Sequence, residues 1–124
     1  MHHSRYTRKE KLKKTNEISL LFEKGKWKTS GNLRIINLRN TEDLSLENTK
    51  FGVSVSKRYF KKAVHRNRIK RLLREAYRLN KDLFKEAFGE KTIAMLFWAS
   101  SEIPTGFQEV ESQFIKLCSS VKKN

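Results

Sequence analysis

The sequence has one cysteine, one proline and no apolar run of the length that a membrane-spanning helix requires. A lone cysteine cannot form an internal disulfide, so nothing in the cysteine content indicates an oxidising, extracytoplasmic compartment. A spanning helix needs about 20 consecutive apolar residues, and the basic residues 1–14 lack the apolar stretch of a secretory signal. We therefore expect a cytoplasmic protein without a membrane segment or a signal peptide.

Residues that usually build metal and catalytic sites are also scarce. There are three histidines, two of them at positions 2 and 3, and His65 has neither a carboxylate nor a nucleophile close to it in the sequence. Glu42, Asp43 and Glu47 fall in residues 40–49, a polar stretch typical of a solvated loop. No acidic cluster has the spacing of a two-metal nuclease site. We expect no catalytic residue and no protein-bound metal or cofactor, and we interpret His65 as a packed or partly exposed side chain.

Positive charge, by contrast, is abundant. The 124 residues include 28 Lys and Arg against 13 Asp and Glu, which gives a formal net charge of +15 at pH 7. Such an excess is typical of a protein that binds a polyanion, with nucleic acid as the first candidate and an anionic membrane surface as the second. The length favours one domain over residues 1–124, with a basic arm at about residues 1–14 and a globular part at about 15–121.

Apolar periodicity and turn residues predict four helices and three strands. The helices are predicted at residues 15–24, 63–80, 82–88 and after Pro104, and the strands at residues 32–39, 50–57 and 92–99. We expect Thr15 or Asn16 to cap the first helix, and Thr105 and Gln108 have the spacing of a capping box before the last one. The continuous apolar run of residues 92–99 predicts a buried central strand. This order indicates an α+β sandwich with a small central sheet.

One face of the strand at residues 50–57 carries only small side chains. Gly52, Ser54 and Ser56 share this face, opposite Phe51 and its apolar neighbours. A face of small residues lets another element approach closely. Three side chains elsewhere are interpreted as core or loop packing: Trp27, Trp98 and Cys118.

The helix at residues 63–80 divides into an apolar face and a basic face. On a helical wheel, Ile69 and Leu73 centre the buried face, and His65 falls on the same side. The basic arc and its flanks consist of Arg66, Asn67, Arg68, Lys70, Arg71, Arg74 and Arg78. Solvated faces usually mix charge signs, whereas Glu75 is the one acidic residue here, and the planar fork of arginine suits phosphate. The arc therefore favours nucleic acid, with a solvated face or a calmodulin- or membrane-binding helix as alternatives.

Two segments carry a family resemblance. Residues 50–57, KFGVSVSK, and residues 63–77, AVHRNRIKRLLREAY, closely resemble the signature strand and Arg-Asn-Arg helix of the bacterial ribonuclease P protein component. Leu12-Lys13-Lys14 and then Ile18, Phe22 and Gly25 stand at the spacing of that family. The resemblance covers roughly residues 5 to 120.

The resemblance implies a small protein that binds a large catalytic RNA and helps it to remove the 5′ leader of precursor tRNA. Hydrolysis would use Mg²⁺ held by the RNA, and neither DNA nor a membrane would be a partner. The implied fold is an α/β sandwich with a left-handed β-α-β crossover. The implied contacts to the catalytic RNA are Arg66, Asn67, Arg68, Lys70, Arg71 and Arg74. The implied cleft for the single-stranded leader contains Phe22, Ile18, Ile36 and Lys57.

The chain departs from the family pattern in two places. Ile18 and Ile36 stand where family members often have aromatic residues. The loop at residues 59–62 is about one residue longer, and Tyr59 and Phe60 are either exposed stacking groups or packing residues. Phe22 on an apolar helix face is likewise either a wall of the cleft or a core residue. A structural ribosomal protein, an RNA chaperone and a protein-only endonuclease are the alternative functions.

Overall fold

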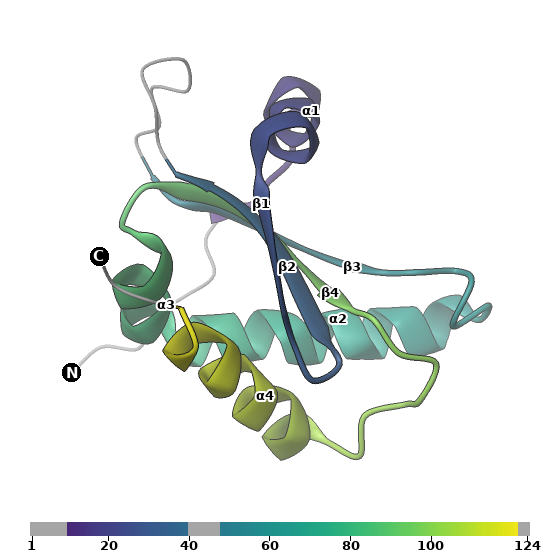
Figure 1. Ribbon diagram of the computed structural model, residues 1–124. Coiled ribbons are helices and arrows are strands. Elements are labelled where there is room, and N and C mark those ends of the chain that lie inside the picture. The colour runs from purple at the N-terminus through teal and green to yellow at the C-terminus, as the bar shows by residue number, and fades with distance from the viewer. Residues whose placement is uncertain (1–9, 40–47, 122–124) are drawn as a thin grey trace.

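The computed structural model describes residues 10–39 and 48–121 (Figure 1). Its elements in chain order are α1 (Thr15–Lys24), β1 (Lys26–Ser30), β2 (Leu33–Arg39), β3 (Lys50–Val55), α2 (Ala63–Leu79), α3 (Lys81–Phe88), β4 (Thr92–Trp98) and α4 (Phe107–Ser119). The predicted α+β class is confirmed. Two sequence-based expectations lie outside the described residues: the first nine residues of the basic arm, and the acidic residues of the loop at 40–47.

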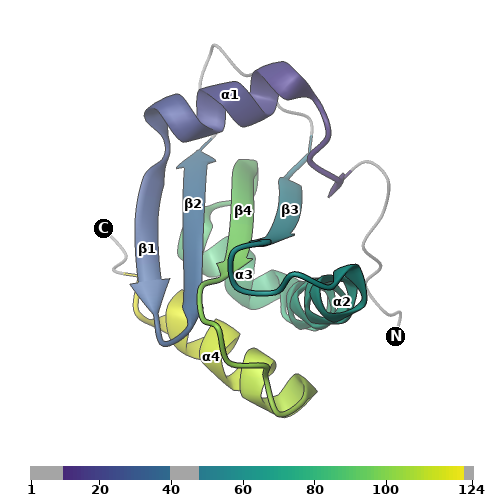
Figure 2. The ribbon, with the colours of Figure 1, turned by 90° about the vertical axis from the view of Figure 1, so that its right-hand side faces the viewer.

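The described strands form one mixed sheet in the order β1-β2-β4-β3, which confirms the central position predicted for β4. β1 and β2 pair antiparallel, as do β2 and β4, whereas β3 and β4 pair parallel. Parallel neighbours need a crossover, and α2 and α3 provide it in a β-α-β unit. Figures 1 and 2 show α1 on one face of the sheet and α2, α3 and α4 gathered on the other.

The main core lies between the sheet and α2, α3 and α4. Its centre is aromatic: the rings of Phe51 and Tyr77 stack 4.0 Å apart, and Phe84 meets both edge-on at 5.7 and 5.3 Å. Trp98 is buried and donates its Nε1–H to the Glu102 carbonyl at 2.8 Å, as the packing interpretation expects. Cys118 is also buried, and this burial raises the pKa of its thiol to about 12.

A second, smaller core lies beneath α1 on the opposite face. It consists of Leu12, Leu21, Ile36 and Ile93, with Ile18, Leu38, Met95 and Phe97 packed at its margin. The N-terminal segment reaches this core along the free edge of β3. There the Leu12 N–H donates to the Phe51 carbonyl at 3.3 Å, and a Cβ on Gly52 would stand 3.3 Å from Leu12 Cβ. The predicted close approach is thus confirmed at Gly52, where Leu12 is the approaching residue, whereas Ser56 lies beyond the end of β3.

Glu10 ties the same segment to the helices of the main core. Tyr77 donates its hydroxyl to Glu10 Oε2 at 2.7 Å, and Lys81 Nζ lies 2.7 Å from Glu10 Oε1. The packed part of the chain therefore includes Glu10–Leu12, which precede the expected start of the globular part at about residue 15.

Three local expectations are corrected. β1 was not expected; it pairs with β2 through a two-residue turn at Gly31 (φ 58°) and Asn32. α1 begins after Lys14 without a side-chain cap from Thr15 or Asn16, because both residues already lie within the helix. At the start of α4, Thr105 bonds to Glu109 rather than to Gln108: its N–H and its hydroxyl lie 2.7 and 3.1 Å from Glu109 Oε1.

Candidate nucleic-acid interface

The basic face of α2 is built as the helical wheel predicts. Ile69, Leu73, Ala76 and Tyr77 are buried against the sheet. On the other side Asn67, Arg68, Arg71 and Arg74 are exposed, and Lys70 is half-buried. No acidic residue occurs between Ala63 and Arg74. A row of like charges opposes folding unless an anion neutralises it, so this surface is suited to a polyanion.

Glu75, the acidic residue in α2, is engaged at the far end of the helix. Arg78 donates Nε–H to Glu75 Oε1 at 2.6 Å and Nη2–H to Oε2 at 2.9 Å. These hydrogen bonds hold the pKa of the Glu75 carboxyl below its ordinary value. Glu75 therefore offsets charge near the C-terminal end of α2, while the exposed arginines nearer the N-terminal end keep their net charge.

Two residues at the start of α2 are placed differently from expectation. His65 was expected on the buried side, but its side chain is exposed, because the first turn of α2 extends past the edge of the main core. Arg66 is half-buried, and its Nη1 donates to the carbonyls of Phe60 and Lys61 at 2.9 and 2.8 Å.

A basic hollow continues the charged surface toward α1. It has a volume of about 420 Å³ and lies between the N-terminal segment, the edge of β3 and α2. Lys11, Lys13 and Arg74 contribute its cations, and Gly52 and Met95 lie among its other lining residues. Gly52 widens the hollow because it carries no side chain there.

The density of positive charge predicts that anions stabilise the free protein. At a net charge of +15 self-repulsion lowers stability, and an anion that binds the folded state raises it. We expect a higher thermal midpoint in sulfate than in chloride at matched ionic strength. An acidic protein measured in parallel controls for the general salting-out effect of sulfate. Equal midpoints in the two salts would show that the basic surfaces bind no anion.

The face of the sheet beside α1 holds a cluster of aromatic rings. Phe22 of α1, Trp27 of β1 and Phe97 of β4 have ring centroids 5.5–6.3 Å apart. Arg34 of β2 lies over the indole, with its Cζ 4.3 Å from the ring centroid. Phe22 is 47% exposed and Trp27 is 45% exposed. Exposed aromatic rings beside a guanidinium group are what unpaired bases stack on.

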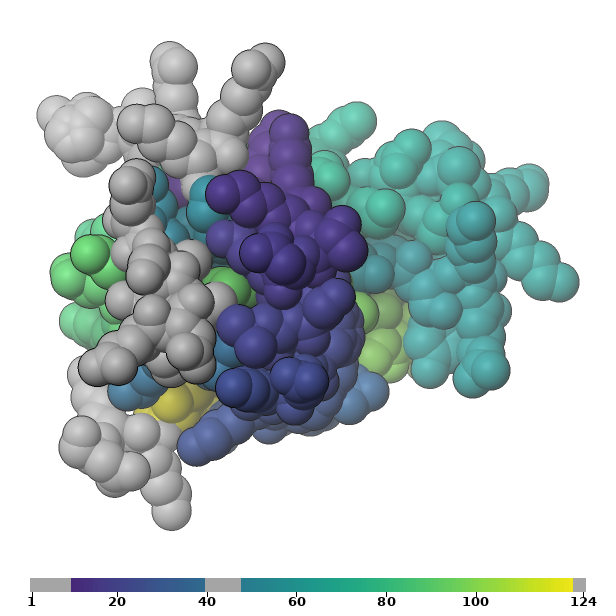
Figure 3. Space-filling model, turned by 90° about the horizontal axis from the view of Figure 1, so that it is seen from above, coloured from purple at the N-terminus to yellow at the C-terminus, as the bar shows by residue number. Residues whose placement is uncertain are grey.

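Figure 3 shows this side of the molecule from above α1. The purple and blue surface of α1 and β1 lies beside the teal surface of the segment from β3 to α2, and green atoms from the later part of the chain show between them in the lower part of the view. The aromatic cluster thus lies on the face of the sheet beside α1, whereas α2 packs against the opposite face.

The structure separates the four residues expected in the leader cleft. Phe22 is on the exposed surface, and Lys57 is exposed in the loop after β3. Ile18 is half-buried at the margin of the smaller core. Ile36 has no exposed surface because α1 packs over it. Ile36 is therefore corrected from a cleft wall to a support beneath α1.

Sequence reasoning missed Trp27, Arg34 and Phe97. Trp27 was interpreted as loop packing because the strand that presents it was not expected. Gly31-Asn32 between two alternating segments is a hairpin signal and could have revealed that strand. Phe97 was hidden in a continuous apolar run, although it alternates with the buried Leu96 and Trp98.

Membrane-spanning helices and metal-binding clusters are both absent from the residues that the structure describes. No helix in this part of the chain has both the length and the apolar content to cross a bilayer. Within the same ranges, no three His, Cys, Asp or Glu side chains come together as a metal site would need.

Comparison with known proteins gives one consistent result. The family model for Ribonuclease P matches residues 6–122. The chain is 38% identical over 109 residues to the ribonuclease P protein component of Porphyromonas gingivalis, covering 85% of this chain and 77% of that one. It is 40% identical over 77 residues to the same component of Clostridioides difficile, covering 62% and 63%.

Solved structures agree in fold. The RNase P protein from Thermotoga maritima superposes with a TM-score of 0.73 at 21% identity, over 92% of this chain and 99% of that one. The RNase P protein of Staphylococcus aureus gives a TM-score of 0.72 at 19% identity, over 90% and 96%.

Proposed function

Since the chain belongs to the ribonuclease P protein family, we propose that it is the protein subunit of that ribonucleoprotein enzyme. In this role it binds the catalytic RNA and the 5′ leader of precursor tRNA. The endonucleolytic cut then gives the mature 5′ end of the tRNA. The observation that carries the proposal is the exposed basic face of α2, which includes Asn67 and Arg68 of the family's Arg-Asn-Arg motif.

The catalytic RNA is proposed to lie along the exposed face of α2. Arg68, Arg71 and Arg74 project from successive turns, so they can follow a phosphate backbone. Arginine binds phosphate through paired N–H donors, and each contact releases counterions from the RNA. The hollow lined by Lys11, Lys13 and Arg74 extends this surface toward α1.

The leader is proposed to bind on the face of the sheet beside α1. Phe22 supplies an exposed ring there, and the cluster with Trp27 and Phe97 offers the stacking surface that Ile18 and Ile36 do not. Arg34 places a positive charge over the same cluster. A single strand can thus find stacking and charge neutralisation together.

Hydrolysis is assigned to Mg²⁺ ions held by the partner RNA, and the protein holds no catalytic residue in this proposal. Its contributions are to bind the leader and to screen the repulsion between phosphates, which lowers the Mg²⁺ concentration that the RNA needs. The proposed partners are this RNA and precursor tRNA, without DNA or a membrane, and the proposed location is the cytoplasm.

The test of the proposal is the salt dependence of RNA binding. Arg71→Ala and Arg74→Ala should each weaken binding to the catalytic RNA and lower the slope of log K against log salt by about 1. Lys85→Ala removes an exposed charge from α3 and serves as the control that keeps the wild-type slope. Unchanged slopes in both arginine variants would mean that the arc is a solvated face.

A pull-down from cells separates the proposal from its alternatives. Recovery of one large RNA together with precursor tRNA supports the ribonuclease P subunit. Recovery of ribosomal subunits would instead favour a structural ribosomal protein, and cleavage of precursor tRNA by RNA-free protein would favour a protein-only nuclease.

A further inference from the structure

The loop between β3 and α2, residues 56–62, is held by Arg66. The guanidinium group of Arg66 reaches back from the first turn of α2, and its Nη1 donates to two loop carbonyls, Phe60 O at 2.9 Å and Lys61 O at 2.8 Å. Both carbonyls precede the start of α2, so the helix itself does not satisfy them. One side chain therefore fixes the exit of the loop to the helix that follows it.

The loop is also closed by its own backbone. The N–H groups of Tyr59 and Phe60 donate to the Ser56 carbonyl at 3.2 and 3.1 Å, and the Arg58 N–H donates to Ser56 Oγ at 3.0 Å. Phe60 is only 5% exposed and packs in the main core. Each of the two interpretations of the aromatic pair therefore applies to one ring. Phe60 is a packing residue that anchors the loop, whereas Tyr59 is an exposed ring, with 43% of its surface accessible.

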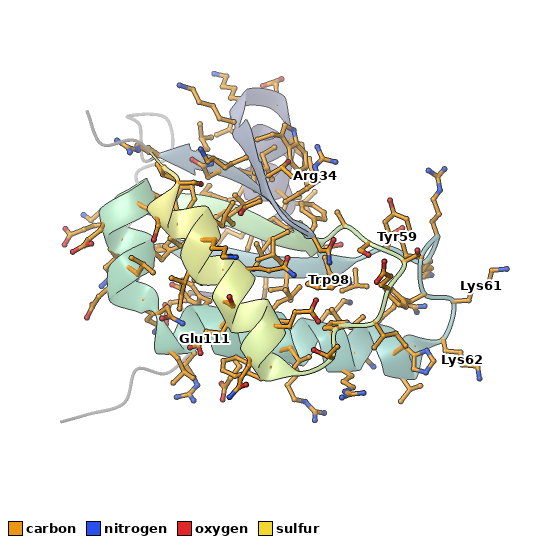
Figure 4. All side chains as sticks on the ribbon, turned by 60° about the horizontal axis from the view of Figure 1, so that its bottom comes forward. Arg34, Tyr59, Lys61, Lys62, Trp98 and Glu111 are labelled. Carbon is orange, nitrogen blue, oxygen red and sulfur yellow. The ribbon has the colours of Figure 1, made fainter. Side chains whose placement is uncertain are left out.

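The exposed side chains of the loop are basic. Tyr59 is flanked in the sequence by four exposed basic residues: Lys57, Arg58, Lys61 and Lys62. Figure 4 shows Lys61 and Lys62 pointing outward from the loop that presents Tyr59. The first turn of α2 holds no acidic residue and its start has no side-chain cap. The loop cations repel one another and the positive N-terminal end of α2. This repulsion opposes the closed conformation of the loop, which the hydrogen bonds described above hold in place.

From this arrangement we propose that Tyr59 is a stacking platform for one unpaired base of an RNA, with the neighbouring loop cations binding the flanking phosphates. Arg66 is then a positioning residue: it holds the loop in the shape that presents Tyr59. An aromatic ring within a basic surface is the combination that binds single-stranded nucleic acid. The proposal rests on the proposed function, because it assumes an RNA partner. The unpaired base belongs either to the catalytic RNA or to the leader.

The platform is tested by Tyr59→Ala and Tyr59→Phe in the reconstituted holoenzyme. One arm measures affinity for the catalytic RNA, and the other measures the ratio of precursor to mature tRNA affinity. Tyr59→Ala should reduce one of these quantities by at least about fivefold, whereas Tyr59→Phe keeps the ring and should stay near wild type. Leu79→Ala, a similarly exposed side chain at the other end of α2, is the matched control.

The outcomes separate the two sources of the base. A loss in the first arm assigns the base to the catalytic RNA, and a loss confined to the second assigns it to the leader. No loss in either arm, or an equal loss in Tyr59→Phe, overturns the stacking proposal. If Arg71→Ala and Arg74→Ala still weaken RNA binding in that case, the proposed function stands and only the platform fails.

The positioning role of Arg66 is tested by Arg66→Gln in the free protein. Hydrogen exchange at the amides of Tyr59 and Phe60 should become faster, because the loop loses its tie to α2. The Tyr59→Ala/Arg66→Gln double variant should lose less RNA affinity than the sum of the two single losses, since both changes remove the same platform. Unchanged exchange together with fully additive losses would show that Arg66 contacts RNA directly.

Discussion

Replacing Phe22 by alanine is expected to weaken binding of precursor tRNA to the reconstituted holoenzyme by about 5- to 150-fold and to leave binding of mature tRNA unchanged. The range corresponds to the loss of about 1–3 kcal/mol of base stacking. The two substrates differ only in the leader, so the ratio of their affinities isolates the leader contact. Trp27→Ala should change the ratio in the same direction, because the two rings lie in one cluster.

The exposure of Phe22 decides between its two interpretations. A buried phenylalanine replaced by alanine costs about 3–5 kcal/mol of stability, and both substrates would then be lost together. Phe22 is 47% exposed, so only part of that cost applies and the thermal midpoint should fall less than for a buried ring. Leu21, the adjacent residue, is fully buried and carries the packing of α1.

The measurement is paired: the thermal midpoint of the variant and its ratio of precursor to mature tRNA affinity. Ile115→Ala is the control, since Ile115 is an exposed apolar side chain on α4, on the opposite side of the sheet. A reduced ratio at a near-normal midpoint supports the leader site. A collapsed midpoint with an unchanged ratio would return Phe22 to the core.

Features with strong local patterns could be predicted from the sequence. α2 has an apolar stripe and a basic arc over many turns, so its faces follow from the helical repeat alone. β4 is a continuous apolar run because both faces of a central strand are covered. The end of α3 follows from Gly89, whose φ of 101° few other residues adopt.

Features that depend on distant partners could not be predicted in this way. The contact of the N-terminal segment with the edge of β3 is one of them, since Leu12 meets Phe51 and Gly52 from about forty positions away. Glu10 meets Tyr77 and Lys81 across more than sixty positions of sequence, so local periodicity contains no sign of the contact. The expectation of a left-handed crossover came from the family resemblance, because right-handed connections are the physical default.

The candidate site shows the same division. The exposed arginines of α2 were predicted because they share one element with the apolar face that orients them. The aromatic cluster draws its rings from α1, β1 and β4, and packing alone brings these elements together. The prediction that Ile36 lines the cleft was wrong for the same reason. Ile36 is on β2, and the helix that buries it, α1, is a separate element that only packing brings close.

Because α1 packs tightly on the sheet at Gly25, we expect Gly25→Ala to destabilise the protein by about 1–3 kcal/mol, the usual cost of overpacking a core. Gly25 has φ −70°, so its role is not conformational freedom. A Cβ there would stand 2.7 Å from Ile36 Cγ1 and would also collide with the Leu21 carbonyl oxygen. That oxygen accepts the Gly25 N–H at 2.7 Å, so the end of α1 must shift.

Urea unfolding measures this effect, with Gly106→Ala as the matched control. Gly106 has an extended backbone at φ 168°, and nothing lies within 4 Å of the added Cβ, so its variant should be neutral or slightly stabilised. Ile36→Ala removes one of the two colliding atoms, and Gly25→Ala should therefore cost less in that background than in the wild type. Because α1 carries Phe22, the shift should also lower the ratio of precursor to mature tRNA affinity. A Gly25→Ala variant as stable as Gly106→Ala would mean that α1 sits farther from Ile36 than these distances require.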